Sequence, residues 1–266
     1  VEELQMTLSQ LYEQKPDWFQ CETAELPIRV NILDPMDKLS VQIHPDDAFA
    51  KHYNGGRGKP EAWVILDTTE DGGIQFGHHA KTKEEFMQMT EANDFVHLLK
   101  YLKAVKDGFI DIPSGTLHAI GKGVLTYNIS RNADCTLRLY DYDRIDPATG
   151  KKRDIQPKAV YDNVNIPDTS TTFVVYPSAY ERGIHVTRYW DEPGLYTLLR
   201  LQVEAQGSFK HDRFAFYTCV KGEGSIQGVP IRQGETMLVP HGMGMLEFKG
   251  VMDLFLASYR NEKDEA

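Results

Sequence analysis

Short apolar runs separated by turn residues dominate the chain from Ile28 onward. Their length and their content of β-branched and aromatic residues are typical of strands. Asp-Pro and Asp-Lys pairs mark the turns between the first of these runs. The pattern predicts strands at 30–33, 39–43, 63–66, 109–112, 124–129, 196–203, 214–220, 234–239 and 251–259.

Two segments follow a helical period instead. Apolar residues at helical spacing predict an amphipathic helix over 2–14. The segment 83–103 predicts two short helices, one on either side of Asn93-Asp94. Pro113-Ser114-Gly115 and Gly222-Glu223-Gly224 predict tight turns.

The order of these elements predicts a mainly β protein, because many short strands at regular spacing are typical of a β-sandwich or jelly-roll barrel. The stretch from Arg144 to Arg182 is polar and rich in turn residues, so we place a domain junction there. Beyond it, GEGSIQGVPIRQGETMLVP is cupin-like: glycine turns alternate with strands, and the last strand ends at Pro240. DIPSGTLHAI in the first half is similar.

Composition limits the possible partners. The net charge of −10 argues against nucleic-acid binding as the main activity, although a few local cations can still bind one phosphate group. The chain has no apolar run long enough to span a membrane and no visible signal peptide. Cys21, Cys135 and Cys219 are odd in number and far apart, so we expect free thiols and a cytoplasmic, reducing location.

Four residues in three short stretches are candidate metal ligands: Gln42, His44, Glu61 and His118. Two imidazoles, a carboxylate and an amide oxygen together suit a divalent transition metal. Gln42 and His44 are two apart in a strand and therefore face the same side of a sheet. The wide separation of Glu61 and His118 favours ligands on neighbouring strands of one barrel. Taken singly, each residue also fits a structural role in a core, strand or surface.

The stretches LSVQIHPDD, GKPEAW, IPSGTLHAIGKG and TLRLYDYDR occur in this order and resemble the type I phosphomannose isomerases, specifically their short bacterial form. The resemblance covers about 28–144 closely and the second half more loosely. It implies two cupin-like barrels, of which one carries a metal. We therefore expect a catalytic domain at 1–150, a connecting region at 151–183 and a C-terminal domain at 184–266. The family also has an upstream segment, which we expect to precede Val1.

The resemblance further implies one Zn²⁺ held by Gln42, His44, Glu61 and His118, with iron as the chemical competitor. The implied reaction interconverts mannose 6-phosphate and fructose 6-phosphate through a cis-enediol. The implied partner is a small sugar phosphate, and we expect a monomer or a homodimer without nucleic-acid or membrane partners.

Three further positions match the family's active site. Arg138 is expected to support the reaction electrostatically or to orient the sugar; otherwise it is a surface residue paired with Asp141 or Asp143. Lys59 is expected to contact a substrate hydroxyl or phosphate, and Ser40 lies where the family binds the phosphate. Asp46-Asp47, in contrast, are expected to cap the next helical turn.

Asn128 departs from the family, which has a glutamate ten residues before the active-site arginine. An amide cannot act as a base but can bind a sugar hydroxyl. Either another group is the base, or the substrate differs, or activity is reduced. The last alternative makes the protein a metal-containing sugar-phosphate-binding or regulatory cupin; an iron-dependent oxygenase is a third possibility. His185, His211 and His241 are expected to be structural.

Overall fold

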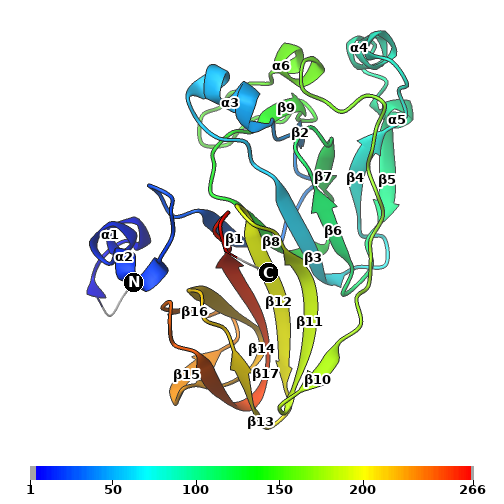
Figure 1. The fold of residues 1–266 in the computed structure, drawn as a ribbon. Coiled ribbons are helices and arrows are strands. Elements are labelled where there is room, and N and C mark those ends of the chain that lie inside the picture. Colours follow the sequence, from blue (N-terminus) through cyan, green and yellow to red (C-terminus); the bar gives the residue numbers. More distant parts are fainter. Residues whose placement is uncertain (1–3, 265–266) are drawn as a thin grey trace. The chain divides into compact units, whose positions relative to one another are not determined.

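The computed structural model describes residues 4–264 and confirms a mainly β fold with a few helices (Figure 1). The strands form three antiparallel sheets, which lie in two compact units. One unit comprises Asn31–Val175, and the other joins the described residues before Asn31 to those from Tyr176 onward. The division falls between Val175 and Tyr176, and the described residues before Asn31 group with the C-terminal strands.

Two sheets build the unit that begins at Asn31. The four-stranded sheet has the order β1 (Ile28–Leu33, of which Asn31–Leu33 belong to this unit), β8 (Val124–Arg131), β3 (Glu61–Thr68) and β6 (Phe109–Ile112). The five-stranded sheet has the order β5 (Leu99–Lys103), β4 (Gly73–His78), β7 (His118–Ile120), β2 (Val41–Ile43) and β9 (Leu137–Tyr140).

The two sheets face each other, because buried side chains from both pack in one cluster. Trp63 and Ile110 come from the four-stranded sheet, and Ile74, Phe76 and Ile120 come from the five-stranded sheet. Burying the apolar sides of both sheets supplies the main driving force for this sandwich. It also places the ends of β2, β3 and β7 around a common interior.

Helices cover the outer side of the five-stranded sheet (Figure 1). Phe86, Leu98 and Val160 pack there against Ala119 and Leu137. These helical residues belong to α4 (Lys83–Glu91), α5 (Phe95–Leu98) and α6 (Pro157–Tyr161). The remaining helix of this unit is α3 (Asp47–Asn54). As expected, Asp46 caps it by accepting a hydrogen bond from the Phe49 amide at 2.8 Å.

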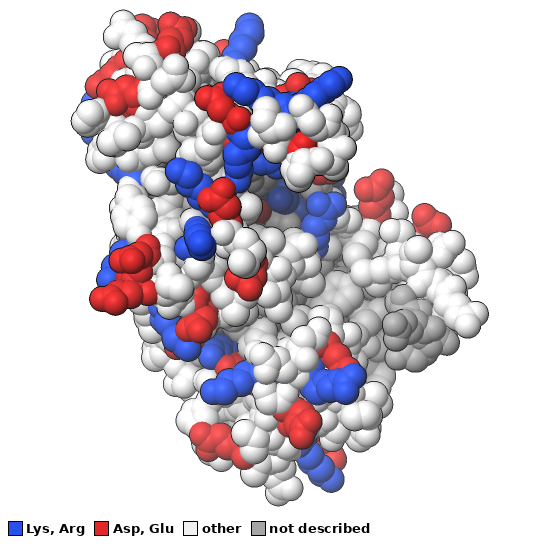
Figure 2. Space-filling view, turned by 180° about the vertical axis from the view of Figure 1, so that it is seen from behind, with Lys and Arg blue, Asp and Glu red and all other residues white. Residues whose placement is uncertain are grey.

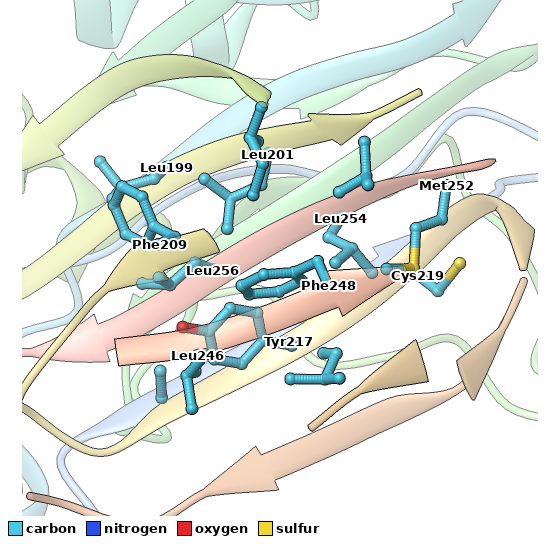
Figure 3. Close-up of a cluster of buried hydrophobic side chains, with 14 of the residues drawn as sticks. Leu199, Leu201, Phe209, Tyr217, Cys219, Leu246, Phe248, Met252, Leu254 and Leu256 are labelled. Carbon is cyan, nitrogen blue, oxygen red and sulfur yellow. The ribbon is translucent and has the colours of Figure 1, made fainter. Parts of the chain in front are cut away.

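The other unit is a single eight-stranded sheet preceded by α1 (Leu8–Gln14) and α2 (Pro16–Phe19). The long strand β17 pairs first with β13 and then with β12, and β14 runs along it, so the sheet folds around its own core. Tyr217, Phe248 and Leu254 lie in that core (Figure 3). The strands are β10 (Ala179–Glu181), β11 (Ile184–Asp191), β12 (Tyr196–Val203), β13 (Gln206–Lys210), β14 (Ala215–Ile226), β15 (Val229–Arg232), β16 (Thr236–Val239) and β17 (Met245–Tyr259).

Both predicted helical segments are shorter than expected. The N-terminal helix begins at Leu8, because Thr7 is extended and caps it together with Gln10; the first residues of the predicted helix lie outside the described part. The prediction of helix up to Lys103 is wrong. Leu99–Lys103 form strand β5, since pairing with β4 and burial of Leu102 in the core outweigh local helix preference.

The predicted turn at Gly222-Glu223-Gly224 is also wrong, because these residues continue strand β14. Gly222 has a φ of +77°, and a β-carbon there would lie 2.1 Å from the Val251 carbonyl oxygen. Glycine therefore permits an irregular, close approach of β14 to β17 rather than a reversal. The reversal comes at Gln227 and Gly228, which both have positive φ.

The three cysteines are free thiols, as predicted. Within residues 4–264, helices of the length and apolarity needed to cross a bilayer do not occur.

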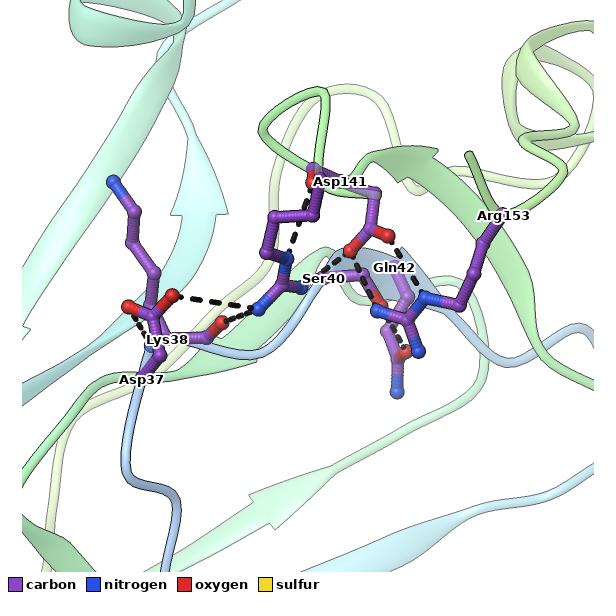
Figure 4. A network of polar contacts seen from close by, with 7 residues as sticks. Asp37, Lys38, Ser40, Gln42, Asp141 and Arg153 are labelled. Atoms are coloured by element: carbon purple, nitrogen blue, oxygen red, sulfur yellow. Dashed lines mark hydrogen bonds and ion pairs between the residues drawn. The ribbon is translucent and has the colours of Figure 1, made fainter. Parts of the chain in front are cut away.

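Asp141, just after β9, ties together two segments that flank the candidate site (Figure 4). Its buried carboxylate accepts two hydrogen bonds from Arg153, at 2.8 and 2.6 Å, and a further one from Arg144. Arg144 also donates to the Lys38 carbonyl, in the segment that leads to β2. Burial alone would raise the pKa of Asp141, but the two arginines outweigh it and lower that pKa.

We expect Asp141→Asn to lower the free energy of unfolding at pH 7 by about 2 kcal/mol, because charge-assisted hydrogen bonds are lost while both arginines can still reach water. Since the folded-state pKa lies below the unfolded value of about 3.9, this stabilisation is complete above that value. It disappears as the pH falls through the folded-state pKa. Urea unfolding at pH 7 and about pH 3 measures the difference between wild type and variant.

Asp143→Asn is the matched control, because Asp143 makes only an exposed pair with Lys152. Asp143→Asn should change the free energy of unfolding by less than about 0.5 kcal/mol. A loss for Asp141→Asn that is no larger than that of the control, or that persists undiminished in acid, would contradict this account.

Candidate metal centre

Three of the predicted ligands meet between the two sheets of the first-described unit. His44 follows β2, His118 begins β7, and Glu61 begins β3 on the facing sheet. The His44 Nε2 lies 3.6 Å from Glu61 Oε2, and the His118 Nε2 lies 3.5 Å from Glu61 Oε1. All three side chains are buried, with at most 4% of each residue exposed.

Backbone carbonyls fix the protons of both histidines. The Nδ1 of His44 lies 2.9 Å from the Cys135 carbonyl oxygen, and the Nδ1 of His118 lies 2.9 Å from that of Thr116. A carbonyl oxygen can only accept, so each Nδ1 carries a proton and donates it, and Nε2 is the ring nitrogen that faces Glu61. Both Nε2 atoms are buried and lack a hydrogen-bond partner among the described residues.

The charge states leave the cluster in need of a cation. Burial lowers the pKa of His118 to about 4, so its ring is neutral near pH 7. Burial would raise the pKa of Glu61, but His44 and Lys59 outweigh it and hold that pKa well below its usual range. The Nε2 atoms of two imidazoles thus converge on an ionised carboxylate, and the three ligand atoms lie within 4.8 Å of one another. Two nitrogen donors and one carboxylate fit a divalent transition metal.

This cluster is the only group of three potential His, Cys, Asp or Glu ligands within residues 4–264. His185, His211 and His241 of the other unit belong to no such group. For His211, burial lowers the pKa to about 4, so it too is neutral near pH 7.

Gln42 faces the same interior as His118. The two residues are direct partners between β2 and β7, and direct partners in antiparallel strands point to the same side. The Gln42 amide oxygen accepts a hydrogen bond from the buried Ser40 hydroxyl at 3.0 Å (Figure 4). Ser40 and Gln42 are therefore in direct contact.

Arg138 is the partner of Gln42 on its other side, in β9, so it belongs to the same row of the sheet. Its Nε is buried without a hydrogen-bond partner among the described residues. The alternative of a surface pair with Asp141 or Asp143 does not hold, because Asp141 binds Arg144 and Arg153, and Asp143 binds Lys152. The positive charge of Arg138 thus remains available to a ligand.

Lys59 and Asn128 both contact Glu61. The Lys59 Nζ lies 3.3 Å from Glu61 Oε2, and only 14% of the Lys59 side chain is exposed. The Asn128 Nδ2 donates to the same oxygen at 3.3 Å, and the Asn128 Oδ1 accepts from Asn31 at 3.0 Å. All the residues predicted for the site therefore lie in this one unit.

Sequence reasoning missed two supporting residues. Gln156 accepts a hydrogen bond from the Arg138 amide at 3.0 Å and donates its own amide to the Arg138 carbonyl at 2.7 Å, which fixes β9 along its free edge. Nothing in the sequence marks this contact. Asn31 carried a weak signal, since it is a polar residue inside the apolar strand IRVNIL.

A separate cavity of about 450 Å³ lies near the turn after β7. Lys38, Tyr101 and Lys122 are among its lining residues, whereas none of the predicted site residues lines it. We give more weight to the His–Glu–His cluster, because the chemistry of its atoms defines what can bind.

A β-sandwich with a buried His–Glu–His cluster between its sheets defines a cupin-like protein with a candidate metal centre. No protein-family model matches the sequence. The chain is 36% identical over 258 residues to the mannose-6-phosphate isomerase ManA of Bacillus subtilis (strain 168), covering 94% of this chain and 81% of that protein. It is 33% identical over 263 residues to the mannose-6-phosphate isomerase of Streptococcus mutans, covering 96% and 81%.

The fold agrees with this similarity. The crystal structure of the mannose 6-phosphate isomerase from Bacillus subtilis matches with a TM-score of 0.89 and 28% sequence identity, covering 94% of this chain and 81% of that one. The chain belongs to the mannose-6-phosphate isomerase family.

Proposed function

We propose that the chain is a zinc-dependent aldose–ketose isomerase that interconverts mannose 6-phosphate and fructose 6-phosphate through a cis-enediol. The observation that carries the proposal is the pair of buried imidazole Nε2 atoms, unpartnered among the described residues, that converge on Glu61. Family membership supplies the substrate and the reaction.

We propose that His44, Glu61 and His118 hold Zn²⁺, with the Gln42 amide oxygen as the fourth protein ligand. Two histidines and one carboxylate also suit non-haem iron, but the additional Gln42 amide ligand favours zinc. When bound, Zn²⁺ would polarise sugar oxygens and offset the negative charge that develops during the proton shift.

The remaining residues act on the substrate in this proposal. Arg138, whose charge has no acidic partner within residues 4–264, orients the sugar and supports the developing negative charge. The Lys59 ammonium donates a hydrogen bond to a sugar or phosphate oxygen, and the Ser40 hydroxyl binds the phosphate. The substrate phosphate needs such nearby cations to bind, because the protein as a whole has a net charge of −10. On the face drawn in Figure 2, basic and acidic side chains are interspersed.

Asn128 does not carry the transferred proton, since an amide is not a base near neutral pH. The proton shift between C1 and C2 therefore depends on another group. The three free thiols support a reducing, cytoplasmic location.

Removal of metal tests the function directly. We expect chelation with EDTA to lower fructose 6-phosphate formation from mannose 6-phosphate by at least about 100-fold, and added Zn²⁺ to restore it. Elemental analysis of the purified protein should find zinc, and a circular dichroism spectrum should show that the fold survives. Full activity after complete metal removal would contradict the proposal. Tight mannose 6-phosphate binding without turnover would instead support a sugar-phosphate-binding protein, and iron in place of zinc would reopen the oxygenase alternative.

A further inference from the structure

Asn31, Asn128 and Glu61 form a line of hydrogen bonds across three neighbouring strands. They lie on β1, β8 and β3, which are adjacent in the four-stranded sheet. Asn31 Nδ2 donates to Asn128 Oδ1 at 3.0 Å, and Asn128 Nδ2 donates to Glu61 Oε2 at 3.3 Å. The line ends on the carboxylate that faces the Nε2 atoms of both histidines.

The direction of this line is fixed. An amide oxygen only accepts and an amide nitrogen only donates, so Asn31 holds the Asn128 oxygen and turns the Asn128 nitrogen toward Glu61. If Asn128 turned over, its oxygen would face the ionised Glu61, and two acceptors would meet in a buried site. Asn128 is only 2% exposed, which leaves little water to relieve such a clash.

The donors around Glu61 act on one of its oxygens. Asn128 and Lys59 both contact Oε2, whereas Oε1 lies 3.5 Å from the Nε2 atom of the neutral His118. A carboxylate held from one side in this way has a defined orientation before any cation arrives. Hydrogen bonds that orient a metal ligand raise metal affinity without touching the metal.

We propose that Asn128, held by Asn31, is a positioning residue for the Glu61 carboxylate and acts on metal affinity rather than on the sugar. This inference rests on the proposed metal site. It gives Asn128 a different task from the substrate contact expected from the sequence. The Asn128 amide donates to the Glu61 carboxylate, which an ionised glutamate at this position could not do.

Zinc affinity of the full-length protein tests the inference, measured for the apo-protein by competition with a chromophoric chelator at neutral pH. Asn128→Leu keeps the branching and approximate size of the side chain but removes the donor. We expect its Kd for Zn²⁺ to rise by about 10- to 100-fold. The KM for mannose 6-phosphate of the zinc-saturated variant should stay within about 2-fold of the wild-type value.

Thr126→Val is the matched control. Thr126 lies two residues before Asn128 in β8, so it points to the same face, and it is equally buried; its hydroxyl has no hydrogen-bond partner. The change also replaces a buried polar side chain with an apolar one of similar shape. The Kd for Zn²⁺ should therefore remain within about 2-fold of wild type.

The zinc affinity of Asn31→Leu is a second, independent test of the inference. Without Asn31 the Asn128 amide loses its fixed direction but can still donate to Glu61, so we expect a smaller rise in Kd, of about 3- to 10-fold. Because Asn31 acts only through Asn128, the double variant should bind Zn²⁺ as weakly as Asn128→Leu alone. If Asn128→Leu fails to fold, the zinc affinity of Asn31→Leu alone tests the inference.

An unchanged zinc Kd in both variants would overturn the inference, as would a raised KM with unchanged zinc affinity, which would make Asn128 a substrate contact. Wild-type protein that binds no zinc would overturn it as well. Wild-type protein that binds zinc but does not isomerise mannose 6-phosphate would refute the proposed function alone, because the zinc affinities of the variants would still decide the role of Asn128.

Discussion

Glu61→Gln is expected to lower zinc affinity and turnover together, each by about 10³-fold. Glu61 is the only anion in the cluster, and its charge offsets much of the charge of a divalent cation. Glutamine preserves the volume and removes that charge. Isothermal titration with Zn²⁺ and initial rates of fructose 6-phosphate formation measure the two effects.

The fold should survive this substitution. Packing between the two sheets, rather than the metal, holds the unit together, and a Gln amide at position 61 can donate to a histidine Nε2 that now has no partner. The metal-free variant should therefore still fold, at a somewhat lower unfolding temperature than the metal-free wild type, because the ionised Glu61 that pairs with Lys59 is lost. Glu70→Gln, at an exposed turn position, is the control and should leave both zinc affinity and turnover unchanged. Full zinc occupancy and full activity in Glu61→Gln would show that the metal site lies elsewhere.

The cluster could be predicted from the sequence because each of its ligands lies at a strand end. His44 stands before a proline that ends a strand, and Glu61 and His118 begin strands after turn residues. Such positions bring residues far apart in the chain to one edge of a sandwich. The motif order then selected the family that the comparisons show.

The contacts that complete the site could not be predicted in this way. The carbonyls of Cys135 and Thr116 set the tautomers of the two histidines, and every residue has a carbonyl. The pairing of Asn31 with Asn128 depends on β1 lying next to β8, which no local pattern specifies.

Errors in the predicted elements have the same origin. Leu99–Lys103 has the composition of a helix, yet it forms a strand because it pairs with the neighbouring strand β4. The glycines at 222 and 224 look like a turn, but they serve a close approach between β14 and β17. In both cases a tertiary contact outweighs the local preference.

Arg138→Ala should separate catalysis from metal binding. Arg138 belongs to the row of the sheet that contains Gln42 and His118, and its guanidinium has no acidic partner in the described part of the chain. Its removal therefore withdraws positive charge from the site without removing a ligand. We expect turnover to fall by about 10²- to 10³-fold, the usual effect of deleting one electrostatic contact to a transition state. Zinc affinity should stay within about 3-fold of wild type, because Gln156 holds the β9 backbone whatever the side chain.

The comparison with Arg138→Lys and Arg232→Ala makes this prediction specific. Lysine keeps the charge but loses the planar set of donors, so it should recover only part of the rate. Arg232 makes an exposed pair with Glu235, and its removal should change turnover by less than about 2-fold. If Arg138→Ala loses zinc in proportion to turnover, the arginine supports the metal site and not the sugar. If it keeps full turnover, the developing negative charge is balanced by other groups, and the role proposed for Arg138 fails while that of Glu61 stands.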